Sequence, residues 1–337
     1  MTQARDPQAA SARTEILLSE DLRKFYGSRL ALHSLSFSLE SGRVLGFLGP
    51  NGAGKTTAMR ILTTILEPSS GRFVVDGISS DQPEKIRHKI GVLPEGLGFP
   101  KQLTAIGYLT YFGQLYGRPS GDARRRGLAL LTDVGLQHRA DSAIGTFSHG
   151  MRQRLGIARA LVNDPAVVFL DEPTLGLDPR GQQELLALIR AIARDRGTGV
   201  VLCSHLLSEI EGICDDVVIM NEGQVVAKGT VAEVIGQTQP TQRNAIRLRV
   251  PPTSVDVARR ALEALPDVEL GTPADETSGW LAVQLVVPDG ESAAEEYRLK
   301  NGILRALIDA DVPVLAFEVG GGRLQDVFLQ LTAETIL

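Results

Sequence analysis

A glycine-rich segment that ends in lysine and threonine is the first part of this sequence that could do chemistry. It runs Gly49-Pro50-Asn51-Gly52-Ala53-Gly54-Lys55-Thr56-Thr57, fits the pattern G-x-x-x-x-G-K-[ST] and follows the apolar run 44–48. Its glycines allow backbone amides to approach phosphate oxygens, and a helix that begins there adds partial positive charge. We expect Lys55 to reach the β- and γ-phosphates of a nucleotide and the Thr56 hydroxyl to bind Mg²⁺. The alternative is a plain glycine turn before a helix.

Two adjacent carboxylates end another apolar run. Residues 167–170 are Val-Val-Phe-Leu, and Asp171 and Glu172 follow them. Ligands of open α/β sheets bind at the carboxyl ends of strands, so Asp171 can hold Mg²⁺ there, directly or through water. Glu172 can polarise an attacking water, and general-base help of this kind is worth about 10²–10⁴-fold in rate. Acidic strand ends are also common as solvated edges. The phosphate loop is what favours catalysis here.

The segment 147–154 opens a further helix. Ser148 is suited to be its N-cap, and apolar residues recur at helical spacing at positions 151, 155, 158 and 161. Taken alone, this is a capped amphipathic helix. Its position between the phosphate loop and the acidic pair suggests that it takes part in the same chemistry.

The elements that must position these residues alternate between strand and helix. Continuous apolar runs predict strands at 36–39, 44–48, 73–75, 90–93, 166–170, 199–203 and 217–220. Helical spacing predicts helices at 55–66, 104–116, 124–131, 180–194 and 206–213. Strands without polar alternation are typical of sheets covered on both faces, so we expect an α/β domain with a largely parallel sheet.

The pattern changes near residue 236. Residues 237–244 have no apolar anchor and indicate a linker, and beyond them strands are expected at 245–250, 268–270, 280–287 and 314–317. With helices at 255–265, within 292–310 and at 324–331, the order βαββαβ predicts a small α+β, ferredoxin-like domain over 245–337. It has no metal spacing, nucleophile constellation or phosphate loop. A dimer brace, a docking surface and a small-ligand sensor all remain open, and Trp280 is expected to serve packing.

Composition narrows the class of protein. The 337 residues include 35 Lys and Arg against 40 Asp and Glu, for a net charge of −5, which argues against a nucleic-acid-binding protein. Cys203 and Cys214 are too few for a disulfide framework and indicate a reducing compartment. No apolar run reaches the roughly 18–20 residues that span a bilayer. Residues 1–14 lack the apolar core of a signal peptide and are expected to form a disordered tail.

Residues 16–235 resemble the nucleotide-binding subunit of ATP-binding cassette (ABC) transporters, with that family's motifs in order. Residues 49–57 match Walker A, 171–172 Walker B, 148–151 the signature, 177–178 the D-loop and 204–205 the H-loop. The resemblance implies that Tyr26 stacks on adenine and that His205 contacts the γ-phosphate. It also implies that Glu95, at the position of the Q-loop glutamine, coordinates the metal through water.

The resemblance implies an architecture and partners as well. The fold would be the P-loop NTPase fold of ABC ATPases over 15–236, with a mixed sheet, an antiparallel β subdomain and a helical subdomain over about 96–162. ATP and Mg²⁺ would be the cofactors. Two ATPase subunits, identical or related, would pair head to tail, so that Ser148 and Gly150 of one bond the γ-phosphate held by the other and Asp178 communicates across the pair. Two permease subunits would dock near 95–116, where we expect the first half of the apolar residues to meet the permease and the second half to pack in the core.

Two departures from the family pattern help to place the chain within it. Glu95 replaces the glutamine, and Phe147-Ser148-His149-Gly150-Met151 replaces the usual Leu-Ser-Gly-Gly-Gln. Both resemble the branch that serves ABC-2-type exporters of drugs, lipids or ions, and they predict an ATPase at the cytoplasmic face of the cell membrane. An importer ATPase is the alternative. A soluble ABC protein acting on ribosomes or DNA is less expected, because the chain has one cassette and no room for a coiled-coil insertion. Glu172 argues against a module that does not hydrolyse ATP.

Overall fold

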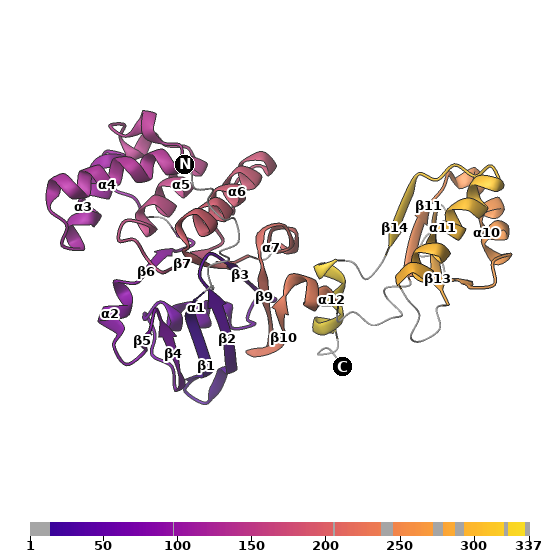
Figure 1. Ribbon diagram of the computed structural model, residues 1–337, viewed down its shortest axis with the longest axis horizontal. Coiled ribbons are helices and arrows are strands. Elements are labelled where there is room, and N and C mark those ends of the chain that lie inside the picture. The colour runs from indigo at the N-terminus through magenta and orange to yellow at the C-terminus, as the bar shows by residue number, and fades with distance from the viewer. Residues whose placement is uncertain are drawn as a thin grey trace, which may run out of the picture. The chain divides into compact units, whose positions relative to one another are not determined.

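The computed structural model describes residues 14–96, 98–204, 206–236, 245–271, 279–286, 293–319 and 323–333. The chain divides into two compact units, one up to Val231 and one from Ala232 (Figure 1). His205, residues 1–13 of the expected tail and the expected linker 237–244 lie outside the described residues.

A ten-stranded sheet organises the described part of the first unit, in the order β5-β4-β1-β2-β10-β9-β3-β8-β7-β6. Neighbouring strands from β9 through β3, β8 and β7 to β6 run parallel, whereas β10 is antiparallel to β9. The strands β1, β2, β4 and β5 pair antiparallel. The bounds are β1 (Glu15–Tyr26), β2 (Arg29–Glu40), β3 (Val44–Leu48), β4 (Ser70–Val75), β5 (Ile78–Ser79), β6 (Ile90–Leu93), β7 (Val167–Asp171), β8 (Gly199–Cys203), β9 (Asp216–Asn221) and β10 (Gln224–Thr230).

The parallel strands are the most apolar part of the sheet. Every residue of β3 and of β8 is buried, as expected for strands covered on both faces. The helix α7 (Leu207–Ile213) packs on β3, α6 (Pro179–Arg196) on β8 and α5 (His149–Ala160) on β6. Burial of this kind fixes the strand ends firmly, and the predicted chemistry lies at those ends.

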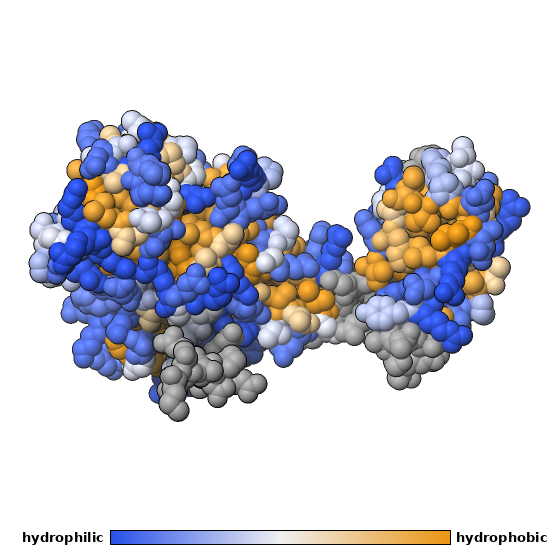
Figure 2. All heavy atoms as spheres, turned by 45° about the horizontal axis from the view of Figure 1, so that its top comes forward, coloured by the Kyte–Doolittle hydropathy of each residue, from blue (hydrophilic) through white to orange (hydrophobic). Residues whose placement is uncertain are grey.

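A group of helices lies at the opposite side of the unit from the antiparallel strands (Figure 1). It contains α3 (Ala105–Leu115), α4 (Ser120–Asp133), two short 3₁₀ turns (Gln137–Arg139 and Ile144–Thr146) and α5. The Thr104 side chain caps α3 by accepting from the Gly107 amide. On the face of the unit that Figure 2 shows, hydrophilic residues predominate and apolar residues are visible in patches between them.

Several expected elements have different limits. The helix α1 (Lys55–Leu62) ends before residue 66, because Thr64 turns left-handed (φ 60°) and the amides of Ile65 and Leu66 both return to the Arg60 carbonyl. The strands β1 and β10 and the helix α2 (Pro83–Arg87) were not expected, and β2 is much longer than 36–39. The helix α4 begins before residue 124, and α8 (Val231–Gly236) follows β10.

The second unit has the expected ferredoxin-like order. Its described elements are β11 (Ala245–Arg249), a 3₁₀ turn (Pro252–Ser254), α10 (Val255–Glu263), β12 (Val268–Leu270), β13 (Trp280–Leu285), α11 (Ala293–Asp309), β14 (Ala316–Val319) and α12 (Leu324–Ala333). The sheet runs β12-β13-β11-β14 with every pair antiparallel, which is the split βαβ arrangement. The last strand, β14, lies at 316–319, two residues later than the expected 314–317.

Trp280 does not belong to the apolar core of this unit. Alternate residues of β13, including Leu281 and Val283, pack into that core, so Trp280 faces the other side of the sheet. There the guanidinium carbons of Arg247 and Arg249 lie 4.7 and 5.9 Å from its ring centre. Trp280 was expected to serve packing, and it packs against these two arginines on the face of the sheet opposite the core.

Candidate nucleotide site

The strand order brings the predicted site residues to one edge of the sheet. The phosphate loop (residues 49–57) follows β3, the carboxylates of Asp171 and Glu172 come at the end of β7, and Glu95 follows β6. The strand β8 separates β3 from β7, and β6 is the next neighbour of β7. Because these strands are parallel, their carboxyl ends meet at the same edge, where α/β sheets bind ligands.

The phosphate loop needs glycine for two different reasons. At Gly49 a side chain would overlap the Met220 carbonyl oxygen and come within 2.8 Å of the Ala53 side chain. Gly54, the N-cap of α1, has a left-handed backbone with φ 100°, which glycine adopts without the steric cost of a side chain. It has no side chain to cap the helix. The first amides of an α-helix have no acceptor within the helix. The N-terminus of α1 is therefore an anion-binding site made of backbone groups and the helix dipole.

Lys55 places its ammonium group at the same loop. Its Nζ donates to the carbonyl oxygens of Gly49 at 2.5 Å and Pro50 at 3.1 Å. These two bonds hold a flexible side chain against the loop. A triphosphate bound at the helix N-terminus would meet this charge directly.

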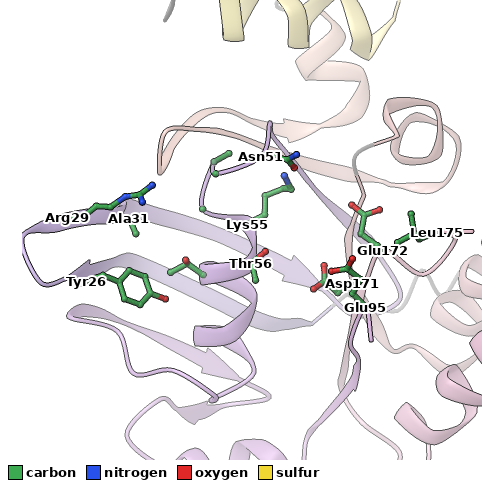
Figure 3. Close-up of a pocket in the computed structure, with 14 residues that line it drawn as sticks. Tyr26, Arg29, Ala31, Asn51, Lys55, Thr56, Glu95, Asp171, Glu172 and Leu175 are labelled. Atoms are coloured by element: carbon green, nitrogen blue, oxygen red, sulfur yellow. The ribbon is translucent and has the colours of Figure 1, made fainter. Parts of the chain in front are cut away.

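Three carboxylates face the loop across the site. Burial raises the pKa of Asp171, and the nearby charges of Glu95 and Glu172 raise it further, against the opposing effect of Lys55 and Arg60. Figure 3 shows the carboxylates of Glu95 and Asp171 next to one another below Glu172. A cation would offset the repulsion between these negative charges. The available donors are carboxylate and hydroxyl oxygens, including that of Thr56, which is the donor set that Mg²⁺ prefers.

One cavity of about 630 Å³ connects these groups. Tyr26 and Arg29 lie at one end and the carboxylates at the other, with the loop between them (Figure 3). Its lining residues are Tyr26, Arg29, Ala31, Asn51, Gly52, Ala53, Gly54, Lys55, Thr56, Thr57, Glu95, Asp171, Glu172 and Leu175.

The lining includes three residues that sequence reasoning missed: Arg29, Ala31 and Leu175. Arg29 pairs with Tyr26 across the β1–β2 hairpin, so a hairpin prediction around Gly27 could have found Arg29 and Ala31. Leu175 lies three residues beyond Glu172, and no pattern marks it.

Ser148, Gly150 and Asp178 do not line this cavity. They line a separate hollow of about 390 Å³ with His149, Met151 and Leu177, where α5 and α6 begin. Ser148 caps α5 by accepting from the Met151 amide at 3.2 Å, and Asp178 caps α6 by accepting from the Gly181 amide at 2.9 Å. The predicted site residues therefore form two groups in one chain.

Comparison with known proteins identifies the family. Residues 32–175 match the ABC transporter family. Over 95% of its length the chain is 30% identical to the linearmycin resistance ATP-binding protein LnrL of Bacillus subtilis, 99% of which is covered. It is 33% identical to the daunorubicin/doxorubicin resistance ATP-binding protein DrrA of Streptomyces peucetius, over 95% of this chain and 93% of that protein. A dimeric bacterial ABC transporter cassette superposes with a TM-score of 0.58 and 25% identity, covering 64% of this chain and 98% of that one.

The chain belongs to the ATP-binding subunits of ABC transporters. Its first unit is an ABC ATPase cassette. Both resistance proteins match over nearly the whole chain, so the likeness extends through the second unit. Among the described residues, no helix combines the length and apolar character that a membrane span requires.

Proposed function

We propose that this chain hydrolyses ATP to power an ABC-2-type exporter of drug-like, lipid or ion substrates. Relatives that match nearly the whole chain are named for resistance to antibiotics. A transporter that gives resistance must carry the compound away from the cell interior, which favours export over import. The replacements at Glu95 and His149 agree with the exporter branch that the sequence resembles.

The residues of the first cavity divide the work of hydrolysis. The loop amides and Lys55 bind the β- and γ-phosphates, and Tyr26 stacks on the adenine at the opposite end. Glu172 accepts a proton from the attacking water, and the oxygen of that water bonds to the γ-phosphorus. The bond between the γ-phosphorus and the bridging oxygen breaks at the same time, and ADP leaves. Thr56, Asp171 and Glu95 would hold Mg²⁺, which when bound neutralises phosphate charge. His205 is proposed to contact the γ-phosphate.

One observation carries the proposed pairing of subunits: the signature residues line a hollow separate from the chain's own ATP cavity. The N-terminus of α5, with Ser148 and Gly150, is an anion site whose anion must come from elsewhere. A second copy placed head to tail would supply the γ-phosphate, and Asp178 would lie near the same contact. The dimeric cassette among the similar structures supports this arrangement.

The proposed permease contact lies on α3 and the turn before it. Leu103, Tyr111 and Leu115 expose between 41 and 61% of their surface, and exposed apolar side chains of this kind suit a partner helix. Tyr108 is buried and its ring contacts those of Phe99 and Phe112, so that part of the segment is core. Docking on permease subunits would keep this chain peripheral at the cytoplasmic face of the membrane.

The proposal is tested by ATP turnover and by co-purification with a permease. The unchanged chain should hydrolyse ATP with Mg²⁺, and Lys55→Ala should abolish turnover. A tagged chain should retain its permease in detergent, and Tyr111→Glu with Leu115→Glu should release it. Leu128→Glu is the matched control, because it charges an exposed leucine on α4 instead. Turnover that survives Lys55→Ala would contradict the proposed site.

A further inference from the structure

The side chain of His149 joins the signature turn to the loop that carries the proposed catalytic glutamate. Its Nε2 lies 2.7 Å from the Leu175 carbonyl oxygen. A carbonyl can only accept, so Nε2 must carry the proton and donate. His149 stands where the usual signature has glycine. Its side chain therefore makes a contact that glycine could not make.

Leu175 belongs to the first cavity, and its neighbours link it to the site. Its amide donates to the Glu172 carbonyl at 3.2 Å, and the residue itself lines the ATP cavity. Gly176 follows with φ 77°, and a side chain there would come within 3.4 Å of the His149 ring. Glycine at position 176 thus leaves room for the imidazole ring of His149.

A continuous set of bonds runs from one group of site residues to the other. It leads from Glu172 through Leu175 to His149, which is covalently next to Ser148 at the N-cap of α5. A second tie joins the same helices, since Arg154 on α5 donates to Glu184 on α6 at 3.0 Å. Displacement of the α5 N-terminus would therefore be transmitted to the loop that carries Glu172.

We propose that His149 is a positioning residue that couples the two ATP sites of the paired ATPase. The inference rests on the proposed head-to-tail function, in which Ser148 contacts the neighbour's nucleotide while Glu172 acts on the chain's own. Binding of the neighbour's γ-phosphate at α5 fixes His149, and His149 fixes the Leu175 turn. Each subunit's own catalytic loop is then held more firmly when the other site is filled.

The test compares the ATP dependence of turnover in the unchanged full-length chain and in His149→Ala. A hydrogen bond of ordinary strength corresponds to a coupling of about fivefold, so kcat should fall about fivefold with little change in KM. The Hill coefficient should fall from above 1 toward 1. His149→Gln places an amide N–H where the imidazole N–H lies, so it should restore both values.

Two controls separate this coupling from other effects. His138→Ala removes another exposed histidine of the same helical region and should leave kinetics unchanged. Thermal unfolding of His149→Ala should stay close to that of the unchanged chain, because the bond is exposed. Equal Hill coefficients and kcat in the unchanged chain and His149→Ala would overturn the proposal, as would a His149→Gln variant that behaves like His149→Ala. Failure of the proposed function itself would appear separately, as turnover that survives Lys55→Ala.

Discussion

The backbone amide of Glu172 donates to the carbonyl oxygen of Cys203 at 3.0 Å. This bond extends the pairing of β7 with β8 one residue past Asp171, which lies opposite Cys203 in the register. It holds Glu172 in the left-handed region, at φ 49°. A conformation of this kind costs on the order of 1–3 kcal/mol and is tolerated where its surroundings fix it. The chain thus places two successive carboxylates in different directions at one strand end.

Replacing Glu172 by glutamine keeps the shape of the side chain and removes its ability to accept a proton. Turnover should fall by about 10²–10⁴-fold, the usual contribution of a general base. ATP should still bind, because the loop and Lys55 are unchanged, and an ATP-bound dimer should accumulate in size-exclusion chromatography. Glu84→Gln, which changes an exposed glutamate of α2 that lines neither group of site residues, is the control and should keep normal turnover. Rapid hydrolysis by Glu172→Gln would refute the assignment of the base.

The raised pKa of Asp171 predicts a pH-dependent gain in stability from Asp171→Asn. The folded chain keeps the Asp171 proton to a higher pH than the unfolded chain, whose reference pKa is 3.8. Stability is therefore lost as pH rises from that value through the folded pKa, and the loss is complete above it. Without metal or nucleotide, the asparagine variant should unfold at a higher urea concentration at pH 7. That advantage should shrink toward pH 4.

The control for this pH dependence is Asp195→Asn, which changes an exposed carboxylate on α6. It should show no comparable gain at any pH. A gain for Asp171→Asn that is equal at pH 4 and pH 7 would contradict the electrostatic origin of the effect.

Gly49→Ala should displace the phosphate loop. The added methyl group would overlap the Met220 carbonyl oxygen, and backbone cannot yield as a flexible side chain does. Overpacking of this kind costs about 1–3 kcal/mol in the free energy of unfolding. Nucleotide affinity should fall as well, because the loop amides would move. Gly212→Ala is the matched change on α7, where the methyl group meets nothing within 4 Å, and it should leave both quantities nearly unchanged or raise stability slightly.

The parts of the fold that follow from local pattern were predictable from the sequence. The phosphate loop, its strand and the start of α1 could be placed because glycine spacing and a continuous apolar run each have a local physical cause. The strands β1 and β10 were missed, because their charged and polar residues break the apolar signal in antiparallel strands. The left-handed turn at Thr64 that ends α1 has no marker in the sequence, since threonine rarely adopts it.

The relations between distant segments could not be predicted from residue pattern alone. The order β3-β8-β7-β6, which brings Glu95 to the loop, depends on strand pairing across long stretches of chain. His149 and Leu175 lie 26 residues apart and meet only because α5 and the loop after β7 pack together. Sequence reasoning identified His149 as a departure from the signature. Its bond to Leu175 emerges from the tertiary structure.

The central claim is that each ATP site is completed by a second copy of the chain, and mixing two inactive variants tests it most directly. Lys55→Ala disables the phosphate loop. Gly150→Asp puts a negative charge at the signature turn, where an acidic residue in the first turn is compatible with helix formation. Head-to-tail pairs of one copy of each retain one site with an intact loop and an intact signature. We predict that the mixture hydrolyses ATP although neither variant does so alone; a mixture as inactive as its components would contradict the account.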